Sequence, residues 1–504
     1  MGVAEVKASL TERDRRFLER SLNGTMWKVV LAVGTPLALY QGLNMVFTIL
    51  DTMMAAHISE ESVSAVAYLS QINLLLSALG GGLAVGAGIQ ISLAYGQGDL
   101  ALVRRRVSSL YVICLAAGLV MLLAILPFTD GFLRLAGTPE ELIAVGRPYF
   151  AVELLVMVVK FLNNVYIAVE RARGNSRRIM NLNFLVIAVK LSLTALFVYV
   201  LEGDLVMIAV ASLASQLAMF AFGVKNSVAS GDGAFSFSPA AVTMDRRTVR
   251  PMLLQSAPVI AEKALFAFGK TVVNAMSTVY GPTLVGAMGV SNNLGGVTTN
   301  PQNGFQEGTA AIISQNYGAG RYQRVLKAFY AALVINVIIG GVVSSLELWQ
   351  LDVLARLFDS GSPAFHREIV TVYRYEALGA VPLGVNAAVL ALLYGLGKTR
   401  LTLLLNFARV FVFRIPVFWL LQHCTTLGEA SAGVVMLVSN LSSGVMAAVV
   451  SIAVIRRYKK QFGLTAAGKK DPPQGETPAQ EEIPEDTPEE IQESDRETTP
   501  GDKQ

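Results

Sequence analysis

The sequence predicts an all-α membrane protein with twelve transmembrane helices in two six-helix lobes, on the evidence of its composition, its apolar stretches and an internal repeat. Hydrophobic residues make up 53% and charged residues 15% of the 504 positions. The mean hydropathy is +0.51, whereas about a quarter of the residues in soluble proteins are charged. A helix needs about 20 mostly apolar residues to cross a bilayer. Twelve such stretches, separated by short polar breaks, follow one another along the chain.

The second half of the chain repeats the first at an offset of 222 to 223 residues. The matched positions are Pro36 with Pro258, Tyr95-Gly96 with Tyr317-Gly318, Gly98 with Gly320, Glu153 with Glu376, Asn163 with Asn386, Gly174 with Gly397, and Asn183 with Asn406. Because six crossings return the chain to its starting side, both copies enter the membrane in the same direction. We therefore expect a pseudo-two-fold axis along the membrane normal.

Lysine and arginine in short loops predict the orientation, since such loops stay in the cytoplasm. One set of breaks, together with the two ends of the membrane region, collects 23 of these residues, whereas the alternate breaks contribute Arg134, Arg356 and Arg367. This distribution predicts a multi-pass protein of the cell membrane with both termini in the cytoplasm.

We divide the chain into five segments at the changes in hydropathy. They are a cytoplasmic N-terminal segment (1–27), an N-lobe (28–227), a cytoplasmic linker (228–250), a C-lobe (251–455) and a disordered acidic cytoplasmic tail (456–504). From Asp471 onward the tail holds 12 acidic and 2 basic residues and little that could form a core.

Several classes of function are excluded by missing motifs. The glycine-rich ends of the second and eighth helices lack the Lys-Ser/Thr of a phosphate-binding loop, so an ion gradient rather than ATP is the expected energy source. The three histidines fall in separate loops without metal-ligand spacing. We expect neither an enzyme nor a resident cofactor, no nucleic-acid partner, and a monomer that contacts lipid and a small-molecule substrate.

Polar residues within the apolar stretches are the candidate functional groups, because each costs about 3 kcal/mol or more at the bilayer centre. In the first helix, Gln41, Asn44, Thr48 and Asp51 share one face. Asp51 could hold a proton or a cation, or could be a solvated residue near the outer helix end.

Glu262 follows Pro258 by one turn in the seventh helix, where a kink beside an acid would give a moving part. It could act in transport or form an internal ion pair with a lysine such as Lys270. Glu153 and Glu376 occupy matched positions in the fourth and tenth helices, and Lys190 adds a positive charge in the fifth.

Together these features resemble the multidrug and toxic compound extrusion (MATE) family over roughly residues 25–455. The resemblance is carried by Asp51-Thr-Met-Met, by the glycine-rich ends of helices two and eight, by the two Gly-x-[Ser/Thr]-Arg loops and by Glu262 after Pro258. It implies antiport driven by Na+ or H+, with Asp51 as the N-lobe carboxylate and with Glu262 and Glu376 in a C-lobe cation site.

In the fifth helix this chain differs from the pattern of the family that it resembles. Where the family often has Asn followed four residues later by an acid, this chain has Lys190 and Thr194. Lys190 could pair with Asp51 and replace the cation, which makes the C-lobe the better candidate for ion coupling.

We therefore expect an antiporter that exports small amphipathic compounds in exchange for Na+ or H+. Its substrate cavity would be lined by Gln41, Asn44, Glu153, Lys190 and Lys270, and any metal would be a Na+ at the coupling carboxylates. The interior lysines raise the hypothesis of an anionic or zwitterionic substrate. The alternative function is a lipid-linked oligosaccharide flippase of the same superfamily.

Overall fold

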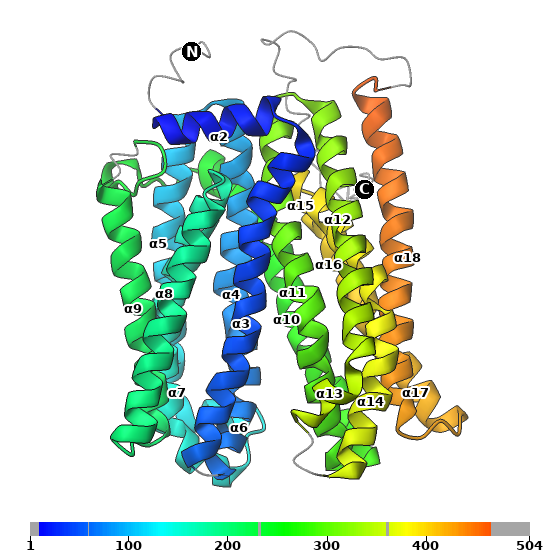
Figure 1. Ribbon diagram of the computed structural model, residues 1–504. Helices are drawn as coiled ribbons and strands as arrows, with labels where there is room; N and C mark the ends of the chain where they lie inside the picture. Colours follow the sequence, from blue (N-terminus) through cyan, green and yellow to red (C-terminus); the bar gives the residue numbers. More distant parts are fainter. Residues whose placement is uncertain (1–9, 59, 230–232, 359–361, 465–504) are drawn as a thin grey trace, which may run out of the picture. The chain divides into compact units, whose positions relative to one another are not determined.

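The computed structural model describes residues 10–58, 60–229, 233–358 and 362–464, and within these ranges every regular element is helical (Figure 1). The described helices belong to one compact unit, residues 1–471. Residues 465–504 of the predicted acidic tail lie outside the described residues. The side chains of part of residues 45–68, including Asp51, are also outside this description.

The first half of the chain forms one bundle of helices. A short helix, α2 (Glu12–Asn23), lies across one end of the long helices (Figure 1), and we call this end of the molecule the α2 end. The other elements are α3 (Met26–Ile58), α4 (Glu60–Gln97), α5 (Leu100–Ile125), η1 (Leu126–Phe128), α6 (Thr129–Leu135), α7 (Glu140–Ala172), α8 (Ser176–Ala195), the π-helical η2 (Leu196–Val200) and α9 (Leu205–Ala229).

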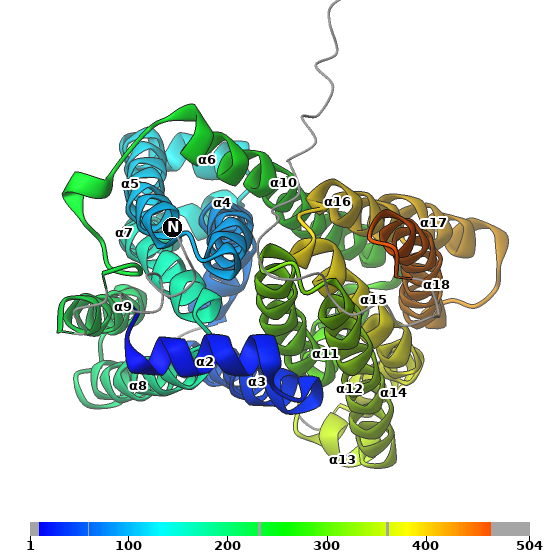
Figure 2. The same ribbon diagram turned by 90° about the horizontal axis from the view of Figure 1, so that it is seen from above.

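The second half forms a matching bundle after a short linker element, η3 (Pro239–Ala241). Its elements are α10 (Arg246–Ser277), η4 (Thr278–Tyr280), α11 (Pro282–Gly318), α12 (Tyr322–Trp349), α13 (Leu351–Arg356), α14 (Pro363–Leu378), α15 (Ala380–Gly395), α16 (Thr399–Phe407), the π-helical η5 (Ala408–Val412), α17 (Ile415–Cys424) and α18 (Ala430–Gln461). Seen from the α2 end, α3–α9 and α10–α18 form two neighbouring groups (Figure 2). We refer to them as the N-lobe and the C-lobe.

Most of these helices have the length and composition of membrane spans. Among the described residues, eight pass that test, and α14 with α15, which meet at 46°, make a ninth. Helices α10 and α11 are less apolar because they carry polar side chains inside the protein, such as Glu262 at 8% and Gln302 at 1% exposure. Helix α18 continues to Gln461, beyond the boundary at 455 expected from the sequence.

The internal repeat is visible in the backbone at the helix ends. Gly98 and Gly320 adopt positive φ values of 79° and 70°, and Gly174 and Gly397 adopt 79° and 69°. In each case the glycine N–H bonds back to a carbonyl three residues earlier, and the next N–H bonds to a carbonyl five residues earlier. This is the left-handed C-terminal cap that favours glycine, and it ends α4, α11, α7 and α15 at equivalent points.

The two lobes contact each other through small residues that let backbones approach closely. A Cβ on Gly86 of α4 would fall on the backbone of Ser256 in α10, and one on Gly304 of α11 would fall on the backbone of Ala38 in α3. Small residues at helix interfaces are typical of membrane proteins, where close packing replaces the hydrophobic effect between helices. These contacts fall in the halves of the helices nearest to the α2 end.

Candidate functional site

Glu262 is a buried carboxylate of the C-lobe that accepts hydrogen bonds from three side chains in the described part of the chain. It lies on α10 one turn after Pro258 and is 8% exposed. The hydroxyl of Tyr394 and the amide of Asn406 each donate to its Oε1 at 2.7 Å, and the hydroxyl of Thr402 donates to Oε2 at 2.7 Å. The donors come from α15 and α16, so the site is built within one lobe.

The hydroxyl of Thr402 gives this site two consistent hydrogen-bond arrangements. It lies 2.7 Å from Oε2 of Glu262 and 2.8 Å from the carbonyl of Thr399, yet it has one hydrogen. When Glu262 is ionised, Thr402 donates to it. When Glu262 is protonated on Oε2, the carboxyl donates to Thr402, which then donates to the Thr399 carbonyl. The same heavy-atom positions therefore satisfy both the ionised and the protonated carboxyl group.

An ion pair joins the two lobes close to this carboxylate. Arg171 of α7 donates to Glu307 of α11, and their side chains are 10% and 25% exposed. Both residues line a small cavity of about 50 Å³ together with Lys263, Gln306 and Tyr394. Tyr394, which donates to Glu262, therefore connects the Glu262 site to the cavity that contains the ion pair.

Further hydrogen bonds hold the lobes together at the α2 end. The side-chain amide of Gln315 in α11 donates to the carbonyl of Ala172 at 2.5 Å and accepts from the hydroxyl of Ser21 at 2.7 Å. Arg324 of α12 donates to the carbonyls of Ser21 and Gly24 at 2.9 and 2.7 Å. The segment around α2 thus links the α2 end of the N-lobe to the C-lobe.

Glu376 lies in a separate environment from Glu262. Its Oε2 accepts from the hydroxyl of Ser291 in α11, and Lys270 is one of the cations that act on it. Lys270 lies eight residues after Glu262 on α10, about 12 Å along a helix. The structure therefore does not bring the two predicted C-lobe carboxylates together, although each lies inside that lobe.

Two arginines share the neighbourhood of Glu376 with Lys270. Arg409 and Arg414 both donate to Oδ1 of Asn440, at 2.8 and 3.2 Å, and Arg414 also donates to Ser439 at 3.0 Å. The guanidinium of Arg409 lies 5.6 Å from the ring centroid of Phe266, a distance typical of a cation–π contact. Together with Lys270, these arginines are the three cations that act electrostatically on Glu376.

Sequence reasoning missed Glu347 of α12, which is 6% exposed. Thr298 donates to its Oε2 at 2.8 Å, and Tyr373 donates to the same oxygen. Its Oε1 has no hydrogen-bond partner among the described residues. The signal that could have identified it is the free-energy cost of placing a charged side chain in an apolar helix that crosses the membrane.

The predicted N-lobe residues are distributed as follows. Glu153 is buried and its Oε2 lies 3.9 Å from Nζ of Lys160 on the same helix. Asn44 is hydrogen-bonded to Tyr40, and Gln41 and Lys190 are half-buried. The side chain of Asp51 lies outside the described residues, so its pairing with Lys190 stays a prediction. Among the described residues there is no cluster of three or more His, Cys, Asp or Glu side chains.

The family model for MatE matches residues 36–196 and 258–420, one segment in each lobe and together more than half of the chain. The chain belongs to the MatE family. The resemblance inferred from the sequence is thereby confirmed, and the protein is a multi-pass membrane protein of a transporter family.

Known relatives of this MatE chain agree with the assignment. It is 21% identical over 436 residues to "Probable multidrug resistance protein YoeA" of Bacillus subtilis (strain 168), covering 83% of this chain and 91% of that one. A solved MATE structure in the straight conformation, 19% identical, has a TM-score of 0.84 and covers 90% of this chain and 100% of its own.

Two further solved structures share the fold of this MatE chain. One is an outward-facing multidrug resistance MATE family transporter that is 19% identical, with a TM-score of 0.83. The match covers 90% of this chain and 99% of that one. The other, from Pyrococcus furiosus, is described as having a binding pocket of reverse polarity, with 19% identity, a TM-score of 0.84 and coverage of 89% and 99%. The predicted fold class, twelve membrane helices in two lobes, is thus confirmed.

A double-mutant cycle on Arg171 and Glu307 tests the ion pair between the lobes. Removing either partner leaves a mostly buried charge without its counterion. We expect Arg171→Gln and Glu307→Gln to show a coupling energy of at least about 1.5 kcal/mol in the free energy of unfolding.

The matched control is the exposed pair Arg134 and Glu140, whose side chains are 62% and 68% exposed. The same two glutamine substitutions should give no measurable coupling there, because water screens exposed pairs. Equal coupling in the two cycles would contradict a structural role for the ion pair between the lobes.

Proposed function

We propose that this chain is a secondary antiporter of the cell membrane that exports small amphipathic compounds in exchange for protons bound at Glu262. The proposal rests chiefly on the arrangement of Tyr394, Asn406 and Thr402 around this carboxylate. An ionised carboxylate and a neutral one are both fully hydrogen-bonded there. That property is needed in a proton carrier, because an unsatisfied buried acid is costly in either state.

Sodium is the alternative coupling ion, since MATE transporters use Na+ or H+. At Glu262 the two carboxylate oxygens accept from three hydrogen-bond donors. A Na+ ion in their place would require these donors to turn away, whereas a proton requires a reversal of the Thr402 hydroxyl alone. The donor set therefore favours H+.

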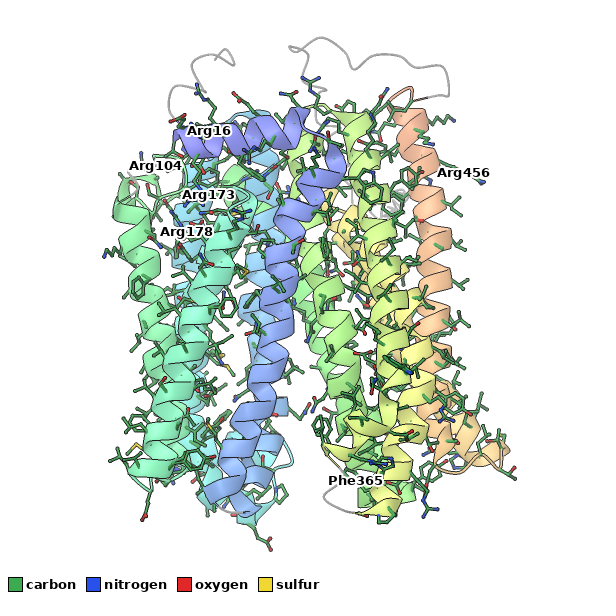
Figure 3. All side chains as sticks on the ribbon, viewed as in Figure 1. Arg16, Arg104, Arg173, Arg178, Phe365 and Arg456 are labelled. Carbon is green, nitrogen blue, oxygen red and sulfur yellow. The ribbon has the colours of Figure 1, made fainter. Side chains whose placement is uncertain are left out.

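The orientation of the helices supports export from the cytoplasm. The labelled Arg16, Arg104, Arg173, Arg178 and Arg456 lie towards the α2 end, and Phe365 lies at the opposite end (Figure 3). By the positive-inside rule the α2 end faces the cytoplasm. The glycine contacts, the ion pair and the hydrogen bonds between the lobes then close the cytoplasmic side, as in an outward-facing state.

Alternating access would follow from rocking of the two lobes about this interface. Opening the cytoplasmic side must separate Arg171 from Glu307 and Gln315 from the carbonyl of Ala172. The state of Glu262 can influence this step, because Tyr394 contacts both the carboxylate and the cavity beside the ion pair. The match to the MatE family favours this function over the flippase alternative.

Neutralising Glu262 should abolish export driven by a pH gradient. In proteoliposomes, we expect Glu262→Gln to reduce proton-driven export to background while the protein stays folded, since glutamine preserves the shape and most of the hydrogen bonds. A Na+ gradient alone should drive no export. Export by Glu262→Gln at the wild-type rate, or export driven by Na+ alone, would rule out protons bound at Glu262.

Glu376→Gln is the matched comparison in that assay, since it is the second carboxylate inside the C-lobe. We expect it to retain dependence on the pH gradient even if its rate falls. If Glu376→Gln abolished the pH dependence and Glu262→Gln did not, the proton site would belong to Glu376.

We also propose that the substrate is anionic or zwitterionic. Lys270, Arg409 and Arg414 all act electrostatically on a single carboxylate, Glu376. Lys270 lies on α10, and Ser291, which donates to Glu376, lies on α11; both helices contact the N-lobe. The Pyrococcus furiosus protein, whose pocket is described as having reverse polarity, shares this fold. A transporter with such a cluster would attract acids and repel lipophilic cations.

Substitution of Lys270 tests the charge of the substrate. We expect Lys270→Gln to raise the KM for export of an acidic dye at least about tenfold, because a hydrogen bond to a charged group contributes about 1.5–3 kcal/mol. Lys327→Gln, on the exposed surface of α12, should change nothing. Robust export of an ethidium-like cation that survives Lys270→Gln would contradict the anionic substrate and leave proton coupling untouched.

A further inference from the structure

A groove on the N-lobe, away from the sites above, has the build of a binding site. It has a volume of about 510 Å³ and lies between α5, α7, α9 and the segment that follows α9. Its lining includes Arg104, Tyr111, Leu115, Tyr166, Phe220 and Phe237. Nothing in the antiport scheme uses this groove.

Helix α5 and the linker between the lobes form two of its walls. Arg104, Tyr111 and Leu115 are seven and four residues apart, so they lie along one face of α5. The ring of Phe237 in the linker meets that of Tyr111 edge to face, with centroids 5.9 Å apart. The linker thereby covers part of the groove.

Two serines of α5 fix the linker in this position. The N–H of Ser238 donates to Ser108 at 3.1 Å. Ser109 donates to the carbonyl of Thr243 at 2.7 Å and accepts from its N–H at 3.1 Å. Both serines are fully buried. The linker wall of the groove is therefore an ordered part of the N-lobe.

The groove is amphipathic along its length. Arg104 is exposed and lies at the α2 end (Figure 3), and within the described part of the chain it forms no ion pair. Eleven residues further on, about 16 Å along the helix, the lining is apolar at Leu115. A cation at the membrane surface and an apolar trough leading inward match a phosphate with an acyl chain.

We propose that this groove binds one anionic phospholipid, with its phosphate at Arg104 and an acyl chain along α5 towards Leu115. Basic pockets between membrane helices on the cytoplasmic side are suited to such headgroups. A zwitterionic lipid carries its own positive group, which the guanidinium of Arg104 would repel, so an anionic lipid is favoured. The neighbouring Arg106 does not compete with Arg104 for the phosphate, because its Nη1 donates inward to the carbonyl of Gln90 at 2.5 Å.

The bound lipid would also act on the connection between the lobes. Phe237 lines the groove, and the linker that contains it leads directly into α10, which carries Glu262. A lipid that fills the groove stabilises the docked linker. Bound anionic lipid is therefore expected to favour the arrangement of the two lobes in which the linker is docked on α5.

Native mass spectrometry of the full-length protein, released from nanodiscs of phosphatidylcholine with phosphatidylglycerol, tests the site. We expect a retained phosphatidylglycerol molecule that Arg104→Gln weakens about fivefold, the factor that corresponds to about 1 kcal/mol for one basic residue near the headgroups. Leu115→Trp should also lower retention by filling the trough. Arg105→Gln is the matched control, since Arg105 is also exposed but is not among the residues that line the groove.

Three results would overturn the proposal. They are equal loss of lipid in Arg104→Gln and Arg105→Gln, equal retention of phosphatidylcholine and phosphatidylglycerol, and retention that Leu115→Trp leaves unchanged. Two results together would assign the groove to the substrate instead. The exported dye would displace the lipid, and Leu115→Trp would raise the KM for export in membranes of phosphatidylcholine alone. None of these outcomes depends on which residue binds the coupling proton.

Discussion

A carboxylate buried in a membrane protein needs a partner for each oxygen in each charge state, and the arrangement around Glu262 meets this requirement. Born costs for an isolated ion in a low-dielectric interior far exceed the stability of a domain. Tyr394, Asn406 and Thr402 offset that cost with three hydrogen bonds. The packing of α10 against α15 and α16 is constrained by the need to present these donors.

The same constraint links the C-lobe to the interface between the lobes. If Tyr394 moved away, Oε1 of Glu262 would keep only the hydrogen bond from Asn406. Tyr394 also lines the cavity that holds Arg171 and Glu307. An interface built on close backbone contact, as between Gly86 and Ser256, has little room for gradual deformation. It is therefore suited to two discrete arrangements, which alternating access requires.

Much of the fold could be predicted from the sequence because the repeat and the apolar stretches are local signals. Spacing alone matches Gly98 with Gly320, and their positive φ values give the physical reason for the match. The charge of Glu262 and its position one turn after Pro258 predict it as a candidate from the sequence alone. Its donors could not be predicted, because they lie 132 to 144 residues further along the chain.

Other residues had a second role that their local sequence does not reveal. Arg171 is one of the 23 lysines and arginines whose distribution predicts the orientation, yet its side chain is 10% exposed and paired with Glu307 of the other lobe. Asn183 and Asn406 are equivalent in the repeat, but Asn183 bonds within its own helix whereas Asn406 donates to Glu262. Such divergence depends on tertiary partners, so matched residues predict the scaffold better than they predict the site.

The most direct test of the link between Glu262 and the interface is a distance measurement across the α2 end. Spin labels at Arg177→Cys and Arg400→Cys, which are equivalent exposed positions in the two lobes, would report its opening in nanodiscs after Cys424→Ser removes the exposed native thiol. We predict that the distance distribution shifts with pH in the otherwise wild-type protein. In Glu262→Gln it should stay at the acid-pH distribution at every pH. An unchanged pH-dependent shift in Glu262→Gln would contradict it.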